Sequence, residues 1–283
     1  MKIGDYTLHE IHAGRLGLDG GAMFGIVPKP LWERRIPADG RNRIPLAMRC
    51  LLLEGDGRLV LIDNGVGDKY DAKFGDIYAV DRESSELHGS LAAAGFGADE
   101  VTDVILTHLH FDHCGGSTVR DASGSLRVAF PNATFHVQRD HWDWAHRSPR
   151  EGASFLPENL DPLEASGQLR LADGPGPVVP GIDALVVNGH TRGQQLLKLS
   201  DAEQTLVFVA DLIPTAAHLP PLWVMAYDIA PLDTLAEKTS LLEQAAQEEW
   251  LLFFEHDTEI ATARVQKGAR GFEAIGASGA LAG

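Results

Sequence analysis

The sequence predicts a mixed α/β fold in which two β-rich halves each supply helices, within one domain spanning residues 1–283. Short apolar runs recur along both halves of the chain, as expected for buried strands. Two segments, 84–94 and 231–250, place apolar residues at helical spacing. The sequence shows no solenoid-type repeat and no extended low-complexity linker, and 283 residues are enough for one large domain.

The first elements are expected to be a strand, a long loop and a hairpin. The strand covers 6–12 and is closed by Gly14. The segment 17–45 holds five glycines and four prolines, and we expect it to be irregular; loops of this length are commonly functional. Apolar runs flank Asp56-Gly57, a pair that tolerates the positive φ angles of tight turns, and therefore predict a hairpin.

The remaining elements are predicted in chain order by the same criteria. A helix over 84–94 stops at Gly95, a short helix covers 139–146, and a long helix covers 231–250. The tail 268–283 is rich in glycine and alanine and is expected to fray. Strands are expected at 101–107, 127–137, 178–187, 195–199, 205–210 and 251–254.

Composition and charge disfavour several classes of protein. The chain has 24 Lys and Arg against 40 Asp and Glu, a net charge of −16, which opposes binding to nucleic acid or to anionic membranes. No stretch approaches the roughly 18 apolar residues that span a bilayer. Two cysteines, Cys50 and Cys114, cannot form a disulfide framework. The N-terminus lacks the apolar core of a signal peptide, so we expect a cytoplasmic protein.

The most informative segment is residues 108–113, which carries three histidines and one aspartate directly after an apolar run. In extended backbone, residues two apart point the same way, so His108 and His110 can reach one metal ion. A turn after them would let Asp112 and His113 face a second ion. With 12 histidines in 283 residues, such a cluster is improbable by chance. It therefore predicts a metal site rather than an ordinary polar loop.

Three later residues share one context, since each follows the exit of an apolar run: His190, Asp211 and His256. Imidazole and carboxylate groups at strand exits are what a site along one edge of a sheet requires. Any one of them alone would be a weak signal, because an aspartate after a strand is most often a turn or a helix cap. Together with the cluster they supply seven ligands, enough for two ions and a bridging water.

These motifs resemble the metallo-β-lactamase-fold hydrolase superfamily, whose signature is HxHxDH followed by His, Asp and His at long intervals. The segment 107–116 is most similar to the branch of N-acyl-homoserine lactonases and methyl parathion hydrolase. Residues 61–65 resemble the strand-end LIDTG element, and 189–194 resemble the GHTPG segment. The resemblance spans about 46–256. It implies an αββα fold, with two β-sheets face to face, helices outside and the site along one edge.

The resemblance also assigns roles to individual residues. Asp63 would hydrogen-bond the free N–H of a ligand histidine, and Asp112 would be catalytic as well as a ligand, by orienting a hydroxide or shuttling its proton. The first metal would be bound by His108, His110 and His190, the second by Asp112, His113 and His256, and Asp211 would bridge both.

The implied activity is hydrolysis by a metal-bridging hydroxide, because two bridged divalent ions lower the pKa of a shared water. The expected substrate is a small hydrophobic molecule with a lactone, carboxylic ester or phosphotriester bond. Zn²⁺ is the expected metal, and Fe, Mn and Co tolerate similar ligands. Two alternatives stay open: a thioester hydrolase of the glyoxalase II type, and a metal-bearing regulatory or binding protein with vestigial activity.

The substrate pocket is less clearly marked in the sequence. Lactonases carry a tyrosine shortly after the bridging aspartate, but Leu212-Ile213-Pro214-Thr215 follows Asp211 here, and only a more distant tyrosine could replace it. The apolar segment 17–45 is also compatible with a homodimer. The residues expected to line the pocket, with core packing as the alternative for each apolar one, are Phe24, Trp32, Trp223, Met225 and Tyr227.

Overall fold

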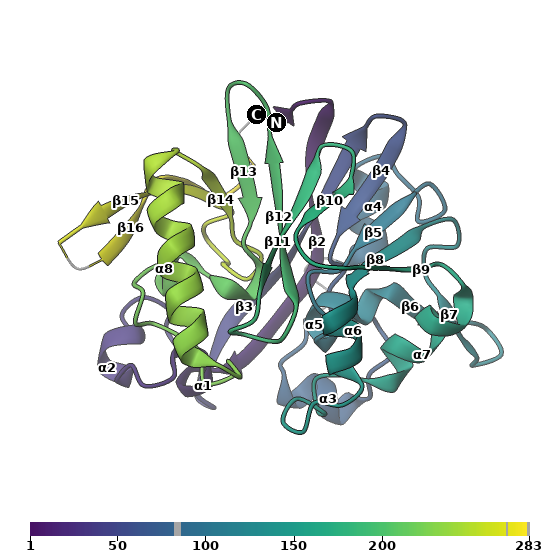
Figure 1. The fold of residues 1–283 in the computed structure, drawn as a ribbon. Coiled ribbons are helices and arrows are strands. Elements are labelled where there is room, and N and C mark those ends of the chain that lie inside the picture. The colour runs from purple at the N-terminus through teal and green to yellow at the C-terminus, as the bar shows by residue number, and fades with distance from the viewer. Residues whose placement is uncertain (82–85, 270, 282–283) are drawn as a thin grey trace.

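The computed structural model describes residues 1–81, 86–269 and 271–281. Its first large sheet has seven strands and contains the predicted hairpin (Figure 1). Asp56 and Gly57 both have positive φ, 51° and 67°, which confirms the tight turn. In spatial order the strands are β1 (Lys2–Ile3), β2 (Tyr6–Asp19), β3 (Arg43–Gly55), β4 (Arg58–Ile62), β5 (Asp103–Ile105), β8 (Thr134–Gln138) and β9 (Leu169–Ala172).

The second large sheet also has seven strands, all from the C-terminal half of the chain. A separate two-stranded ribbon is formed by β6 (Thr118–Arg120) and β7 (Leu126–Val128). In spatial order the strands of the second sheet are β10 (Gly176–Val179), β11 (Ile182–Val187), β12 (Gln194–Ser200), β13 (Thr205–Phe208), β14 (Leu251–Phe253), β15 (Thr262–Gly268) and β16 (Gly271–Ser278).

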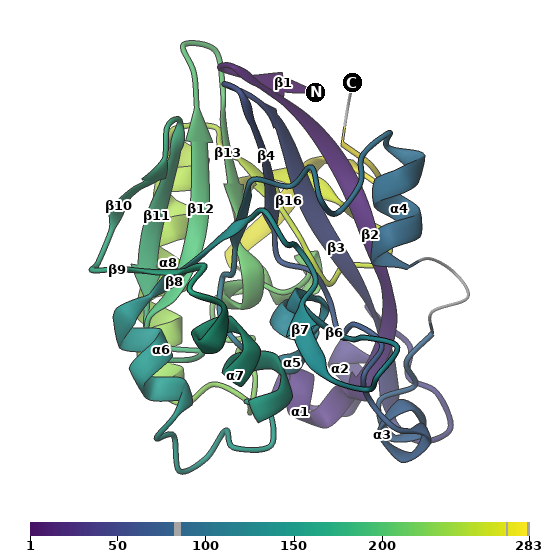
Figure 2. The same cartoon turned by 90° about the vertical axis from the view of Figure 1, so that its right-hand side faces the viewer.

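Helices lie outside the two sheets, as Figures 1 and 2 show, and this confirms the expected αββα arrangement. None of the described helices is long and apolar enough to cross a bilayer. The helices are α1 (Gly20–Phe24), α2 (Lys29–Trp32), α3 (Ala72–Ile77), α4 (Leu87–Ala93), α5 (Phe111–Cys114), α6 (Arg139–Ala145), α7 (Pro157–Ser166) and α8 (Pro231–Gln247), with 3₁₀ turns at Gly115–Ser117, Ala210–Leu212 and Ala216–His218.

Strand β3 shows how the layers are held together, because both of its faces are buried. Leu51 and Leu53 belong to the apolar core between the sheets, which also contains Phe208 of β13. Cys50 and Leu52 point the other way, into the core on the helical side of the first sheet. The continuous apolar run of this strand therefore reflects burial on two faces.

The segment 17–45 is not the irregular loop that its glycines and prolines predicted. Strand β2 continues through Gly14, where a register shift between His12 and Arg15 absorbs the irregularity, and it extends to Asp19. The Asp19 side chain then accepts a hydrogen bond from the Ala22 N–H and caps α1. Two short helices and the start of β3 fill the rest of the segment.

Other boundaries also differ from the prediction. The tail does not fray over its described part, because β16 pairs with β15 at the edge of the second sheet. The segment 178–187 is two strands with a turn between them, since Gly181 adopts a φ of 77°. Residues 127–137 are likewise divided between β7 and β8. The predicted helix at 84–94 is described from Leu87, and residues 84 and 85 lie outside the described part of the chain.

Candidate active site

The candidate metal ligands lie where strands of both sheets end. The histidine motif follows β5, which pairs in parallel with β4. In the second sheet, Asp211 follows β13 and His256 follows β14, and these two strands are also parallel neighbours. His190 follows β11. Because parallel strands end at the same edge of a sheet, residues far apart in the sequence meet at one place.

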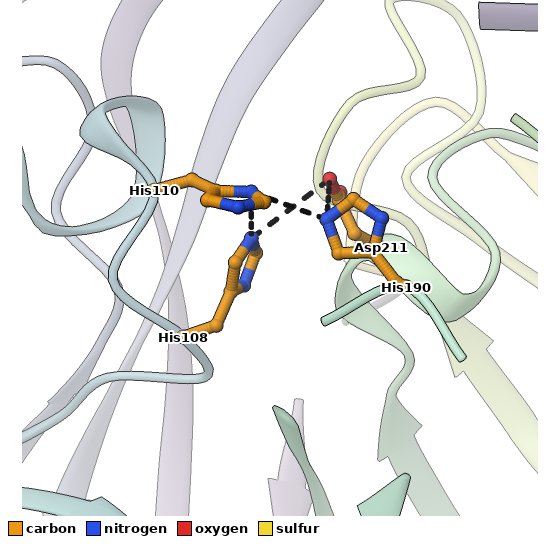
Figure 3. Close-up of side chains that lie close together, drawn as sticks. All are labelled: His108, His110, His190 and Asp211. Carbon is orange, nitrogen blue, oxygen red and sulfur yellow. Dashed lines mark hydrogen bonds and ion pairs between the residues drawn. The ribbon is translucent and has the colours of Figure 1, made fainter. Parts of the chain in front are cut away.

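The first group of side chains is His108, His110, His190 and Asp211, all buried and with donor atoms within 4.8 Å of one another. Figure 3 shows them converging: the two motif histidines reach in from one side, and His190 and Asp211 from the other. The Nδ1 atom of His110 lies 3.0 Å from Nε2 of His108 and 3.2 Å from Nε2 of His190. The inward nitrogens of the three imidazole rings thus converge on one position.

A second group lies beside the first and consists of Asp112, His113 and His256. The Nε2 atoms of the two histidines are 3.1 Å apart. The Asp112 oxygens lie 4.0 Å from His113 Nε2 and 3.8 Å from His256 Nε2. The side chains therefore sort into the two sets that the motif resemblance implied.

Asp211 stands between the two groups and presents one oxygen to each. Its Oδ2 lies 3.2 Å from His190 Nε2 and 4.0 Å from His108 Nε2. Its Oδ1 lies 3.1 Å from His256 Nε2 and 3.5 Å from His113 Nε2. Oδ1 is buried and forms no hydrogen bond to any described residue. A carboxylate in this position is suited to bridge two cations.

The outward nitrogen of each ligand histidine faces a group that can accept its proton. The pairs are His108 with Thr107 Oγ1 at 3.0 Å, His110 with Glu151 at 3.1 Å, His113 with Asp63 at 3.0 Å, His190 with Asp228 at 2.9 Å and His256 with the Ala47 carbonyl at 2.7 Å. The inward nitrogens are then unprotonated lone pairs that converge at 3.0–3.2 Å. Such an arrangement is repulsive unless protons or metal cations lie between the nitrogens, and the imidazole and carboxylate donor set fits divalent metal ions.

Asp63 has the geometry expected of a residue that orients a ligand. Its φ of 55° is unusual for a residue other than glycine. It accepts hydrogen bonds from the Thr107 N–H at 2.8 Å and the Thr107 hydroxyl at 2.6 Å. Its Oδ2 also faces His113 Nδ1. One carboxylate thereby fixes both the start of the motif loop and one ring within it.

Burial and neighbouring charges act in opposite directions on the titration of these groups. Burial lowers the pKa of His256, but the Asp211 carboxylate raises it to about 9. Burial raises the pKa of Asp211, but His113, His256 and His190 hold it well below its usual value. Protons and metal ions therefore compete for the same nitrogens, and metal binding is expected to release protons.

Two carboxylates that orient the first group were not identified from the sequence. Glu151 accepts hydrogen bonds from Trp144 Nε1 and from the Ser148 hydroxyl, in addition to facing His110. Asp228 faces His190 and is almost fully buried. Both are isolated acidic residues far from the motifs, so no pattern in the sequence marked them.

His141 supports the motif from behind. Its Nδ1 donates to the Arg192 carbonyl at 2.7 Å, and its Nε2 accepts from the Leu109 N–H at 2.8 Å. Burial lowers the pKa of this imidazole to about 3, so it stays neutral and keeps this donor and acceptor pattern. These two hydrogen bonds fix the backbone of the histidine motif relative to the loop that carries Arg192.

A cavity of about 150 Å³ opens onto the metal-ligand side chains. Its polar wall includes His110, Asp112, His190, Asp211 and His256. Of the residues expected to line the pocket, Met225 and Tyr227 do so. The rest of the wall includes Leu18, Met23, Tyr78, Phe111, Arg150, Glu151 and Ser154.

Phe24 and Trp32 are not among the residues that line this cavity. Both are fully buried in the apolar core, where their rings stack at a centroid distance of 5.3 Å. Phe24 also stacks on His218, at 4.5 Å. Trp223 lies outside the wall too, beneath the Arg35 guanidinium. Phe24 and Trp32 therefore belong to the apolar core, and Trp223 packs against it. Core packing was the alternative that we expected for these residues.

Comparison with known proteins gives the same family from sequence and structure. The chain is 27% identical to the N-acyl homoserine lactonase AiiA of Bacillus thuringiensis subsp. kurstaki, over 89% of this chain and 93% of that one. It is 31% identical to a probable metal-dependent hydrolase from Staphylococcus aureus, whose solved structure superposes with a TM-score of 0.89 over 100% of both chains.

Two further matches extend the comparison. The dizinc quorum-quenching lactonase AidC has the same fold, with a TM-score of 0.80 at 24% identity over 97% of this chain and 95% of that one. The model of the metallo-beta-lactamase superfamily matches residues 45–256, which is most of the sequence and includes every candidate ligand. The chain therefore belongs to the metallo-beta-lactamase superfamily.

Proposed function

We propose that this protein is a dinuclear metal hydrolase that cleaves a lactone, carboxylic ester or phosphotriester bond in a small apolar substrate. The position of Asp211 is the observation that carries the proposal, because its two oxygens face two separate sets of donor groups. Imidazole and carboxylate ligands suit Zn²⁺. The 27% identical relative is a lactonase, which supports ester-like bonds as the target.

Bound divalent ions would supply an activated water and polarise the oxygen of the scissile bond. The chain itself supplies the groups that move protons and orient the substrate. Asp112 is 6% exposed and lies in the cavity wall beside His113 and His256. Its carboxylate can accept a proton from the attacking water and return it to the leaving oxygen.

Tyr227 is our candidate for the hydroxyl that contacts the substrate oxygen. It lines the same cavity as the ligands, and Tyr78 also lies in this wall. Burial raises the pKa of both hydroxyls, so they remain neutral hydrogen-bond donors at ordinary pH. The proposed hydroxyl of Tyr227 thus lies in the loop between β13 and α8. The lactonase tyrosine, by contrast, is expected shortly after the bridging aspartate.

An apolar groove beside the cavity supports an apolar substrate. The cavity and the groove share Arg150 and Met225 in their walls, so they lie next to each other. Three exposed aliphatic side chains line the groove: Ile26, Leu222 and Leu232, with exposures of 88%, 67% and 79%. Covering them with an aliphatic substituent removes apolar surface from water.

A substrate panel on the metal-loaded protein tests the proposal. The panel contains aliphatic lactones, aryl esters, thioesters and phosphotriesters, and we expect turnover of a lactone, ester or phosphotriester that is lost with a chelator and restored by Zn²⁺. Turnover of thioesters alone would favour the glyoxalase II-type alternative. Absence of turnover across the panel, with metal bound, would favour a binding or regulatory protein.

The apolar preference is tested with one homologous series of substrates of increasing aliphatic chain length. Leu232→Asp places a charge in the groove and is expected to lower kcat/KM for the longest members about tenfold, with little effect on the shortest. Leu31→Asp, at an exposed aliphatic residue of α2 that does not line the groove, is the control. An equal effect on all chain lengths would contradict the role of the groove.

A further inference from the structure

Glu255 is a buried carboxylate that the proposed reaction does not use. It follows β14, directly precedes the ligand His256, and has 0% exposure. Its Oε2 lies 3.0 Å from Nδ1 of His113. Asp63 Oδ2 lies at the same distance from the same nitrogen. Two carboxylates therefore face one imidazole N–H.

One N–H cannot satisfy both carboxylates, and Asp63 is the better placed of the two. Asp63 is already fixed by the Thr107 backbone and hydroxyl. Neither oxygen of Glu255 forms a hydrogen bond with good geometry to any described residue. The charge of Glu255 is therefore not compensated by direct hydrogen bonds, and an uncompensated buried carboxylate is strongly unfavourable.

The nearby arginine does not compensate this charge. The Arg49 side chain donates through Nε to Glu10 and through Nη1 to the carbonyls of Phe254 and Asp257, and it forms no hydrogen bond to the Glu255 carboxylate. The Arg49 backbone N–H does bond to Glu255, but to its carbonyl and not to its carboxylate. The Nε2 atom lies on the side of the His113 ring opposite Glu255, and His113 belongs to the second group of candidate metal ligands. A metal ion bound by this second group would compensate the charge of Glu255.

We infer that Glu255 is a positioning residue for the second metal position and acts on it through His113. This inference rests on the proposed two-metal function. The carboxylate behind Nδ1 makes the opposite nitrogen a stronger donor, and its negative charge attracts the ion without touching it. Two consecutive residues would thus serve the same metal position, because His256 would bind the ion and Glu255 would support the neighbouring ligand His113.

The test compares metal binding by the wild-type protein and Glu255→Gln, a variant of the same shape without the charge. Metal-depleted protein is titrated with Co²⁺, and the two binding phases are followed by absorption and calorimetry. We expect the affinity of the weaker phase to fall about 10- to 100-fold while the other phase changes little. We also expect the Tm of the metal-free variant to be equal to or above that of the wild type, because the Glu255 carboxylate forms no hydrogen bond with good geometry that the amide would lose.

Two other variants keep the inference falsifiable. Glu255→Asp keeps the charge, and its weaker-phase affinity is expected to lie between those of the wild type and Glu255→Gln. Glu10→Gln removes a half-buried carboxylate from the Arg49 network without facing His113, and it should leave both phases unchanged. If Glu255→Gln does not fold, an unchanged weaker phase in Glu255→Asp would contradict the inference.

The contradicting outcomes are distinct from one another. A lower Tm of metal-free Glu255→Gln with unchanged Co²⁺ affinity would show a purely structural role. Binding of a third Co²⁺ that disappears in Glu255→Gln would show that Asp63, His113 and Glu255 bind an ion directly, which would also overturn the inference. A wild-type protein that binds only one Co²⁺ per chain would refute the two-metal proposal itself, and the inference with it.

Discussion

His110 of the histidine motif and Glu151 are in contact with each other in the wall of the cavity. The two atoms, Nε2 of His110 and Oε1 of Glu151, are 3.1 Å apart. Burial raises the pKa of Glu151, but hydrogen bonds from His110 and the Ser148 hydroxyl lower it to about 2. The carboxylate therefore accepts the Nε2 proton of His110, and the inward Nδ1 is left with the lone pair.

Glu151→Gln is expected to lower the affinity for the first metal ion about 10- to 100-fold, because the amide orients the His110 ring without supplying a charge. Calorimetric titration with Zn²⁺ measures this directly. Glu164→Gln, which removes an exposed carboxylate from α7, is the control. Equal Zn²⁺ affinity in Glu151→Gln and wild type would show that the contact does not matter for metal binding.

Asp211→Ala is expected to reduce the metal content from about two ions per chain to less than one. The reason is that two cations would then face each other without a shared anion. Hydrolysis should fall by at least about 100-fold, since both metal positions are affected. Elemental analysis and turnover measurements check the two effects, with Asp201→Ala at an exposed turn as control. Normal metal content with normal turnover would show that another residue bridges the ions.

Trp32→Ala is expected to lower the free energy of unfolding by about 3–5 kcal/mol, as for large aromatic residues removed from a core. The indole packs so closely on Gly20 that a Cβ there would lie 2.4 Å from it. Met225→Ala, by contrast, should change KM, because Met225 lines the cavity. Denaturant unfolding and kinetics per folded molecule separate the two variants. A raised KM in Trp32→Ala with an unchanged free energy of unfolding would show that Trp32 contacts the substrate and is not mainly a core residue.

Asp103 gives a pH dependence of stability whose sign is fixed by its contacts. Burial raises its pKa, but hydrogen bonds from His136, Thr102 and Arg58 lower it from 3.8 to about 2. Because the pKa is lower in the folded state, the carboxylate stabilises the fold above about pH 4, and this contribution is lost between about pH 4 and 2. Urea unfolding of the wild type and Asp103→Asn should show a stability difference that shrinks over this range. A difference that does not change with pH would contradict the assignment.

The candidate metal ligands could be located in the sequence because each follows a recognisable strand. A strand exit fixes where the next side chain lies, and the spacing within 108–113 indicates which donors would share an ion. Asp63, at the end of β4, was assigned from the resemblance to the family motif. The structure brings all of these side chains together.

The supporting carboxylates and the helices of 17–45 could not be predicted in this way. Glu151, Asp228 and Glu255 are single acidic residues, and only the folded chain brings them within 3.1 Å of ligand histidines. The glycines and prolines of 17–45 predicted an irregular loop, but at least one of these glycines serves close packing. Gly20 leaves room for the Trp32 ring, which a side chain at that position would displace.

The number of metal ions per folded chain is the most direct test of the two-metal site. The measurement is elemental analysis of protein purified without chelator, repeated after removal of metal and reconstitution with Zn²⁺. We expect about two equivalents, bound by the two groups that Asp211 joins. A value below about half an equivalent, with no gain on reconstitution, would contradict the metal site, and a constant value of one would contradict the bridge.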